Sequence, residues 1–101
     1  MRHIIAQMMG VVVEFKIFGN RVWIQSNNEM VKQQFIKFLD TKGKEIAAEQ
    51  GGELPMIETD ERTQWVKVTL PYEDNETSEN LITDKFKIDL EKSGLGVKEL
   101  K

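Results

Sequence analysis

The chain has 101 residues, which is room for one compact domain, since domains typically run to roughly 100–200 residues. Apolar residues make up 40% of the chain and charged residues 31%, so neither a disordered chain nor a membrane protein is indicated. The lack of cysteine excludes disulfides, a thiolate nucleophile and cysteine-based metal sites, and it favours a reducing, cytoplasmic location.

The net charge of −3 is distributed unevenly along the chain. Residues 1–44 carry a charge of +4, residues 45–79 carry −8 and residues 80–101 carry +1. Such blocks steer charged partners over about 8–10 Å but do not determine a fold. We expect the acidic block to form a solvated face and loops.

The spacing of apolar residues within 3–9 predicts a short amphipathic helix. Ile4, Ile5, Met8 and Met9 recur with helical spacing, and Gly10 would end the helix. A strand that leads into the next strand is the alternative.

The clearest pattern is a β-hairpin of residues 11–18 and 21–26, joined by Gly19-Asn20 as a two-residue turn. Strand alternation then sorts the side chains onto two faces of the sheet. The core face holds Val11, Val13, Phe15, Ile17, Val22 and Ile24. The outward face holds Val12, Glu14, Lys16, Phe18, Arg21, Trp23 and Gln25, which is a polar surface with two large aromatic rings.

A long helix is expected after the hairpin, because Ser26-Asn-Asn-Glu29 matches a capping box. Its predicted core stripe consists of Met30, Val31, Gln34, Phe35, Phe38 and Leu39. Lys32, Gln33 and Lys37 are predicted to point outward. The pattern leaves open whether the helix ends at Gly43 or continues to Gln50.

The second half of the chain predicts a strand, a helix and a final strand. Residues 53–61 read as a loop or a short edge strand, and residues 63–70 alternate as a strand. A second helix is expected from a cap at Thr77 or Ser78 to about Lys92, although residues 86–90 also alternate like a strand. Ser93-Gly94-Leu95 favours the helix, because it fits a Schellman ending. Residues 96–100 then form a last strand at an edge.

Together these elements predict a single α+β domain over residues 1–101, in the order (α)ββαβαβ. The expected sheet has about four strands of mixed direction, with both helices mainly on one face. The other face would be bare unless the N-terminal segment covers it.

The sequence offers little catalytic chemistry. His3 is the only histidine, and Ser26, Ser78 and Ser93 are each better explained as residues of helix ends. No phosphate-binding loop, dinucleotide-binding turn or zinc-protease motif occurs. We therefore expect no catalytic residue, no cofactor and no metal site.

Two surfaces are candidates for binding. The first is the outward hairpin face, with Lys16, Phe18, Arg21 and Trp23. Lys16–Trp23 and Phe18–Arg21 cation–π pairs would be its purely structural explanation. The second is an acidic surface made of Glu58, Asp60, Glu61, Glu73, Asp74 and Glu76.

These observations favour a small non-enzymatic interaction module, such as an adaptor, regulator or inhibitor, that binds a protein partner. The first alternative is a single-stranded nucleic-acid-binding protein that uses the same aromatic and basic residues, although the net acidity disfavours it. The second is a carboxylate or metal-dependent enzyme. Homo-oligomerisation through the bare sheet face or residues 97–100 is a further expectation.

Overall fold

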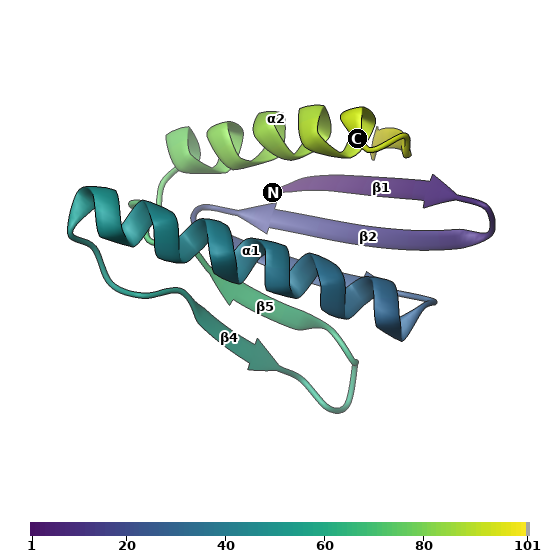
Figure 1. Ribbon diagram of the computed structural model, residues 1–101, viewed down its shortest axis with the longest axis horizontal. Coiled ribbons are helices and arrows are strands. Elements are labelled where there is room, and N and C mark those ends of the chain that lie inside the picture. The colour runs from purple at the N-terminus through teal and green to yellow at the C-terminus, as the bar shows by residue number, and fades with distance from the viewer. Residues whose placement is uncertain (101) are drawn as a thin grey trace.

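The computed structural model describes residues 1–100 as two layers, a six-stranded antiparallel sheet with both helices on one of its faces (Figure 1). The elements in chain order are β1 (Arg2–Met8), β2 (Val11–Phe18), β3 (Arg21–Ser26), α1 (Glu29–Gln50), β4 (Met56–Thr59), β5 (Val66–Thr69), α2 (Glu76–Lys92) and β6 (Gly96–Leu100). Neither helix within residues 1–100 is long and apolar enough to cross a membrane.

The strand order is β4-β5-β3-β2-β1-β6, and every neighbouring pair is antiparallel. The α+β class and the placement of the helices are confirmed, but the expected four-stranded mixed sheet is wrong. Two segments add strands: residues 2–8 lie between β2 and β6, and residues 56–59 form the edge beside β5. The helical connections produce no parallel pair, because neither helix links strands that are neighbours in the sheet. Helix α1 leads from β3 to β4, with β5 between them, and α2 leads from β5 to β6 at the opposite edge.

The core lies between the sheet and the helices. Its centre is the helix-facing side of the hairpin, where Phe15, Ile17, Val22 and Ile24 are fully buried, as the strand alternation predicts. Phe15 contacts Phe35 of α1 and Phe86 of α2 with ring centroids 5.3 and 5.2 Å apart. Aromatic contacts therefore join both helices to the central strand of the sheet.

The predicted helix over residues 3–9 is wrong, because these residues belong to β1. Ile4 and Ala6 point into the core, and β1 pairs with β2 on one side and with β6 on the other. Met9 and Gly10 both have positive φ, 49° and 82°, as the type I′ turn of a tight hairpin requires. Gly10 thus turns the chain between two strands instead of ending a helix.

The first long helix begins two residues later than the capping box indicates. Asn28 is the N-cap, and its side chain accepts a hydrogen bond from the Val31 amide at 3.1 Å. Ser26 instead ends β3, where its Oγ donates to the Val12 carbonyl. The helix passes through Gly43 to Gln50. A Cβ at Gly43 would lie 2.8 Å from the ring of Pro55, so close packing explains this glycine.

The buried stripe of α1 is rotated from the predicted one. It consists of Lys32, Ile36, Leu39, Gly43 and Ala47. Met30 is 73% exposed, whereas Lys32, which was expected to point outward, is 4% exposed. The rotation follows from Ile36, which lies against the sheet and brings Lys32 one turn earlier onto the same side.

The second helix starts at the N-cap Asn75, ahead of the predicted Thr77 or Ser78, and Asn75 Oδ1 accepts from the Ser78 amide at 2.9 Å. Its Schellman ending is confirmed. Gly94 has a φ of 85°, and the Leu95 amide donates to the Leu90 carbonyl at 3.1 Å. The predicted final edge strand is confirmed as β6.

The Gly19-Asn20 turn joins the central hairpin to the segment between β5 and α2. Asn20 Nδ2 donates to the carbonyls of Leu70 and Tyr72, both at 3.1 Å, and the Asn20 carbonyl accepts from the Leu70 amide. Gly19 has a φ of 61°, which fits the first central position of a type II′ turn. A Cβ there would also lie 1.8 Å from Asp74 Oδ1. Both turn residues are therefore fixed by long-range contacts.

Replacing Asn20 with alanine should lower the free energy of unfolding by about 1–3 kcal/mol, because two part-buried carbonyls lose their donor. Urea denaturation measures the change. Gln33→Ala on the exposed side of α1 is the control, and its effect should stay within about 0.5 kcal/mol. Equal effects of the two substitutions would show that the turn is not a long-range anchor.

An ion-pair network ties β1 and β6 to α2. Arg2 donates to both carboxylate oxygens of Glu99 at 2.7 Å and to Asp84 at 3.0 Å. Lys87 adds a third donor to Glu99 at 3.1 Å. The hydrogen bonds from Arg2, followed by those from Lys87, lower the pKa of Glu99 from 4.5 to about 2. The C-terminal strand is thereby held against the helix layer.

The network should stabilise the fold in a pH-dependent way. Since the pKa of Glu99 is about 2 when folded and 4.5 when unpaired, its contribution is complete above about pH 4.5 and disappears as the pH falls towards 2. Glu99→Gln should therefore destabilise the protein by about 1–2 kcal/mol at pH 7, because a bidentate guanidinium pair is lost. Urea denaturation at pH 7, 4 and 2.5 should show the difference from wild type shrinking. A difference that is constant with pH would contradict this account.

Candidate functional site

The four predicted binding residues lie together on the sheet face that no other element of residues 1–100 covers. Lys16 and Phe18 come from β2, and Arg21 and Trp23 come from β3. The predicted register is confirmed, with Lys16 opposite Trp23 and Phe18 opposite Arg21. Phe18 is 46% exposed, and the other three side chains are partly buried. We call this surface the open face.

Strand β5 adds a second tryptophan to the open face. Because β5 pairs with β3, Lys67 lies opposite Trp23, and Trp65 lies just before the start of the strand. Lys16 Nζ lies 4.7 Å from the centre of the Trp65 ring. The expected Lys16–Trp23 pair is therefore wrong, since Lys16 reaches across β3 to the other indole.

The second expected cation–π pair is confirmed. The Arg21 guanidinium lies 5.3 Å from the ring centre of Phe18 and 5.8 Å from that of Trp23. Arg21 also pairs with Asp74 at 3.2 Å. These contacts hold three large side chains in place on the open face, so that the side chains are already ordered before a partner binds.

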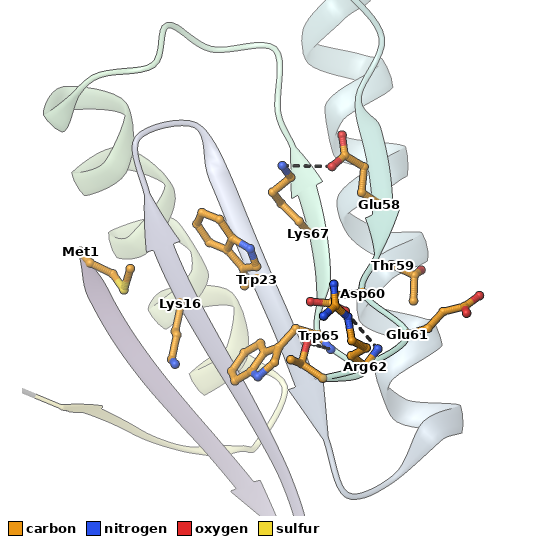
Figure 2. Close-up of a pocket in the computed structure, with 11 residues that line it drawn as sticks. Met1, Lys16, Trp23, Glu58, Thr59, Asp60, Glu61, Arg62, Trp65 and Lys67 are labelled. Atoms are coloured by element: carbon orange, nitrogen blue, oxygen red, sulfur yellow. Dashed lines mark hydrogen bonds and ion pairs between the residues drawn. The ribbon is translucent and has the colours of Figure 1, made fainter.

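The two indoles lie in a shallow, open hollow of about 830 Å³ between β2 and the loop that joins β4 to β5 (Figure 2). Glu58 and Lys67 form an ion pair of 3.0 Å at one side of the hollow. Asp60 and Arg62 lie beside Trp65 (Figure 2). The floor is aromatic and the rim carries both signs of charge.

The loop of residues 60–64 is anchored from both faces of the sheet. Gln25 Nε2 on the open face donates to the Thr63 carbonyl at 3.1 Å. Lys32 on α1 donates to the Gln64 carbonyl at 3.1 Å. Gln64 has a φ of 62°, and its amide donates to the Asp60 carbonyl at 2.7 Å. Burial of Lys32 is thus explained, since the side chain fixes the rim of the hollow.

The structure divides the predicted acidic surface into two groups. Glu58, Asp60 and Glu61 border the hollow at the start of β5. Glu73, Asp74 and Glu76 follow the other end of β5 and enter the first turn of α2. Asp74 already forms an ion pair with Arg21 and accepts a hydrogen bond from the Asn20 amide. Only the first group lines the hollow that holds the two indoles.

The open face carries hydrogen-bonding and stacking groups. His3 Nε2 lies 2.7 Å from Glu14 Oε2, and both belong to neighbouring strands of this face. Among residues 1–100, no three His, Asp or Glu side chains are grouped as metal ligands. The arrangement offers flat aromatic surfaces, cations held near rings, and carboxylates at the rim.

Searches of protein-family models, of curated proteins and of solved structures found nothing that matches this chain. The function proposed below therefore depends only on the residues and geometry of the chain itself.

Sequence reasoning missed Trp65, Lys67 and the role of Glu58 in the site. The alternation of residues 63–70 places Trp65 and Lys67 on the polar side of their strand, which was the available signal. The pairing of β5 with β3 was not visible in the sequence, so these side chains could not be brought beside Lys16 and Trp23.

Substituting Lys32 with methionine should loosen the rim without unfolding the protein. The Gln64 carbonyl loses its charged donor, whereas the methionine side chain still fills the buried site. Hydrogen–deuterium exchange of residues 60–64 should be faster by about tenfold, and the unfolding free energy should change by less than about 1 kcal/mol. Lys37→Met on the exposed side of α1 is the control. Unchanged exchange in the loop would show that Lys32 does not position it.

Proposed function

We propose that this protein is a small non-enzymatic interaction module that binds a protein partner through the open face. The observation that carries the proposal is the presence of Trp23 and Trp65 in one hollow, on a sheet face that the described part of the chain leaves uncovered. Tryptophan and arginine are the side chains that most often dominate the energy of protein interfaces. Here both indoles and Arg21 are already held in place by neighbouring residues.

The extent of the surface supports this proposal. The accessible surface is 6448 Å², about 10% more than the ~5,900 Å² expected for a compact monomer of 11.7 kDa. One side of the sheet is shielded by α1 and α2, and no element of residues 1–100 forms a second layer on the other side (Figure 1). A bound partner would supply that layer and shield the aromatic rings from water.

The charge pattern favours a protein over a nucleic acid. A strand of nucleic acid needs a groove of uniform positive potential for its phosphates. Glu14 lies on the open face beside Lys16, and Glu58, Asp60 and Glu61 border the hollow. Mixed charges of this kind suit a protein surface, whose own side chains carry both signs.

Alanine at both Trp23 and Trp65 should abolish partner binding, because each indole is expected to contribute at least about 2 kcal/mol at the interface. Proteins recovered with the wild-type chain are identified by mass spectrometry, and the purified partner is then titrated by calorimetry. Alanine at Met30 and Ile88, which are 73% and 52% exposed on the helix layer, provides the control. Circular dichroism confirms that each variant is folded.

Loss of the same partner from both double variants would contradict the open face as the interface. An oligonucleotide titration tests the alternative directly. Binding to single-stranded RNA or DNA that weakens steeply with rising salt would replace the proposed protein partner by a nucleic acid.

A further inference from the structure

Strand β4 is an open edge of the sheet (Figure 1). Its residues Glu58 and Thr59 line the hollow on the open face. All four of its residues are exposed, and it packs against β5 without substantial cover from either helix. Met56 is 56% exposed and Ile57 is 43% exposed. The opposite edge, β6, is better protected, because α2 packs over it and Glu99 is held by Arg2 and Lys87.

The ladder between β4 and β5 shows which backbone groups of β4 face outward. The Asp60 amide donates to the Trp65 carbonyl at 2.9 Å, so this pair is hydrogen-bonded. Hydrogen-bonded and non-hydrogen-bonded pairs alternate along an antiparallel ladder. Met56 and Glu58 therefore bond to β5, whereas the amides and carbonyls of Ile57 and Thr59 point to the open edge. These groups are spaced to receive one extended strand.

We propose that a basic, extended segment of the protein partner adds to the sheet along β4. The inference rests on the proposed function and specifies how the partner binds. Residues 53–61 contain four acidic side chains and no basic one. The strand itself carries Glu58, and Asp60 and Glu61 follow at its end without ion pairs to other residues within 1–100. A segment with Lys or Arg complements this edge.

The pairing also defines the pattern of the segment. A residue opposite Glu58 places its side chain on the open face, where a carboxylate can accept a second cation besides Lys67. Residues opposite Ile57 and Thr59 place their side chains on the helix side, next to the exposed Ile57. The expected segment therefore alternates apolar and basic residues.

A second copy of this chain fits the edge poorly. A two-fold axis through Glu58 would set the two Glu58 carboxylates directly opposite each other. An axis through Ile57 would place Thr59 opposite Pro55, which has no amide hydrogen. An axis through Thr59 would place Glu58 opposite Asp60. Each symmetric register thus loses a hydrogen bond or opposes like charges.

The test uses the full chain and a display library of random twelve-residue peptides as the probe. Peptides that bind are expected to be extended, to alternate apolar and basic residues, and to bind less tightly as salt rises. Binding should weaken about tenfold or more in Ile57→Pro, which removes an outward amide at a position where an edge strand tolerates proline. Ile57→Val keeps the amide and should bind as wild type does.

Methylation of single peptide nitrogens provides a second readout that leaves the protein unchanged. Since only every other residue of an added strand bonds to β4, methylation should weaken binding at alternate positions. Equal effects at all positions would overturn strand addition. So would a library that yields no binder, or binders without basic residues.

Two further outcomes separate this inference from the proposed function. Peptides that bind Ile57→Pro normally but fail to bind the Trp23/Trp65 variant would overturn strand addition while leaving the open face as the interface. A concentration-dependent dimer that Ile57→Pro abolishes in sedimentation would make the occupant a second copy, which contradicts the inference.

Discussion

The contact between the Gly19-Asn20 turn and the segment from Leu70 to Glu79 organises the whole molecule. The side chain of Asn20 holds the carbonyls of Leu70 and Tyr72, and the Gly19 amide donates to Glu79 at 3.0 Å within α2. The turn thereby fixes where β5 ends and where α2 begins. Since Trp65 lies just before β5 and α2 covers β1 and β6, one short turn sets both the open face and the helix layer.

The local signals of the sequence were read correctly where the determining contacts are short-range. The hairpin register follows from the turn and from strand alternation, and the Schellman ending follows from Gly94 and Leu95. Residues 3–9 were misread because the spacing of Ile4, Ile5, Met8 and Met9 fits a helix better than the alternation of a strand. Pairing with strands on both sides decides the conformation there, and β6 is almost the whole chain away.

The residues of the candidate site also fall into those that short-range signals place and those that long-range contacts place. Lys16, Phe18, Arg21 and Trp23 were predicted from one hairpin, whose register a local turn determines. Trp65 could not be assigned to them, because no short-range signal shows that β5 pairs with β3 rather than with another strand. Lys32 was misplaced because its charge suggested an exposed position, whereas the Gln64 carbonyl and the Glu29 carboxylate together satisfy its ammonium group. Such exceptions arise where a polar side chain positions a loop.

The open face and the edge of β4 are contiguous, since the Glu58–Lys67 pair belongs to both. A protein that lays one extended segment along β4 brings the residues next to that segment close to Trp65 and Trp23. Each contact alone is of modest strength, because four residues of backbone pairing and a shallow hollow bury little surface. When one partner makes both contacts, the second contact forms within a complex that the first has already assembled. Its effective concentration is then in the millimolar range. Specificity then requires an alternating basic strand and an adjoining apolar surface in the same molecule, which excludes partners that carry only one of them.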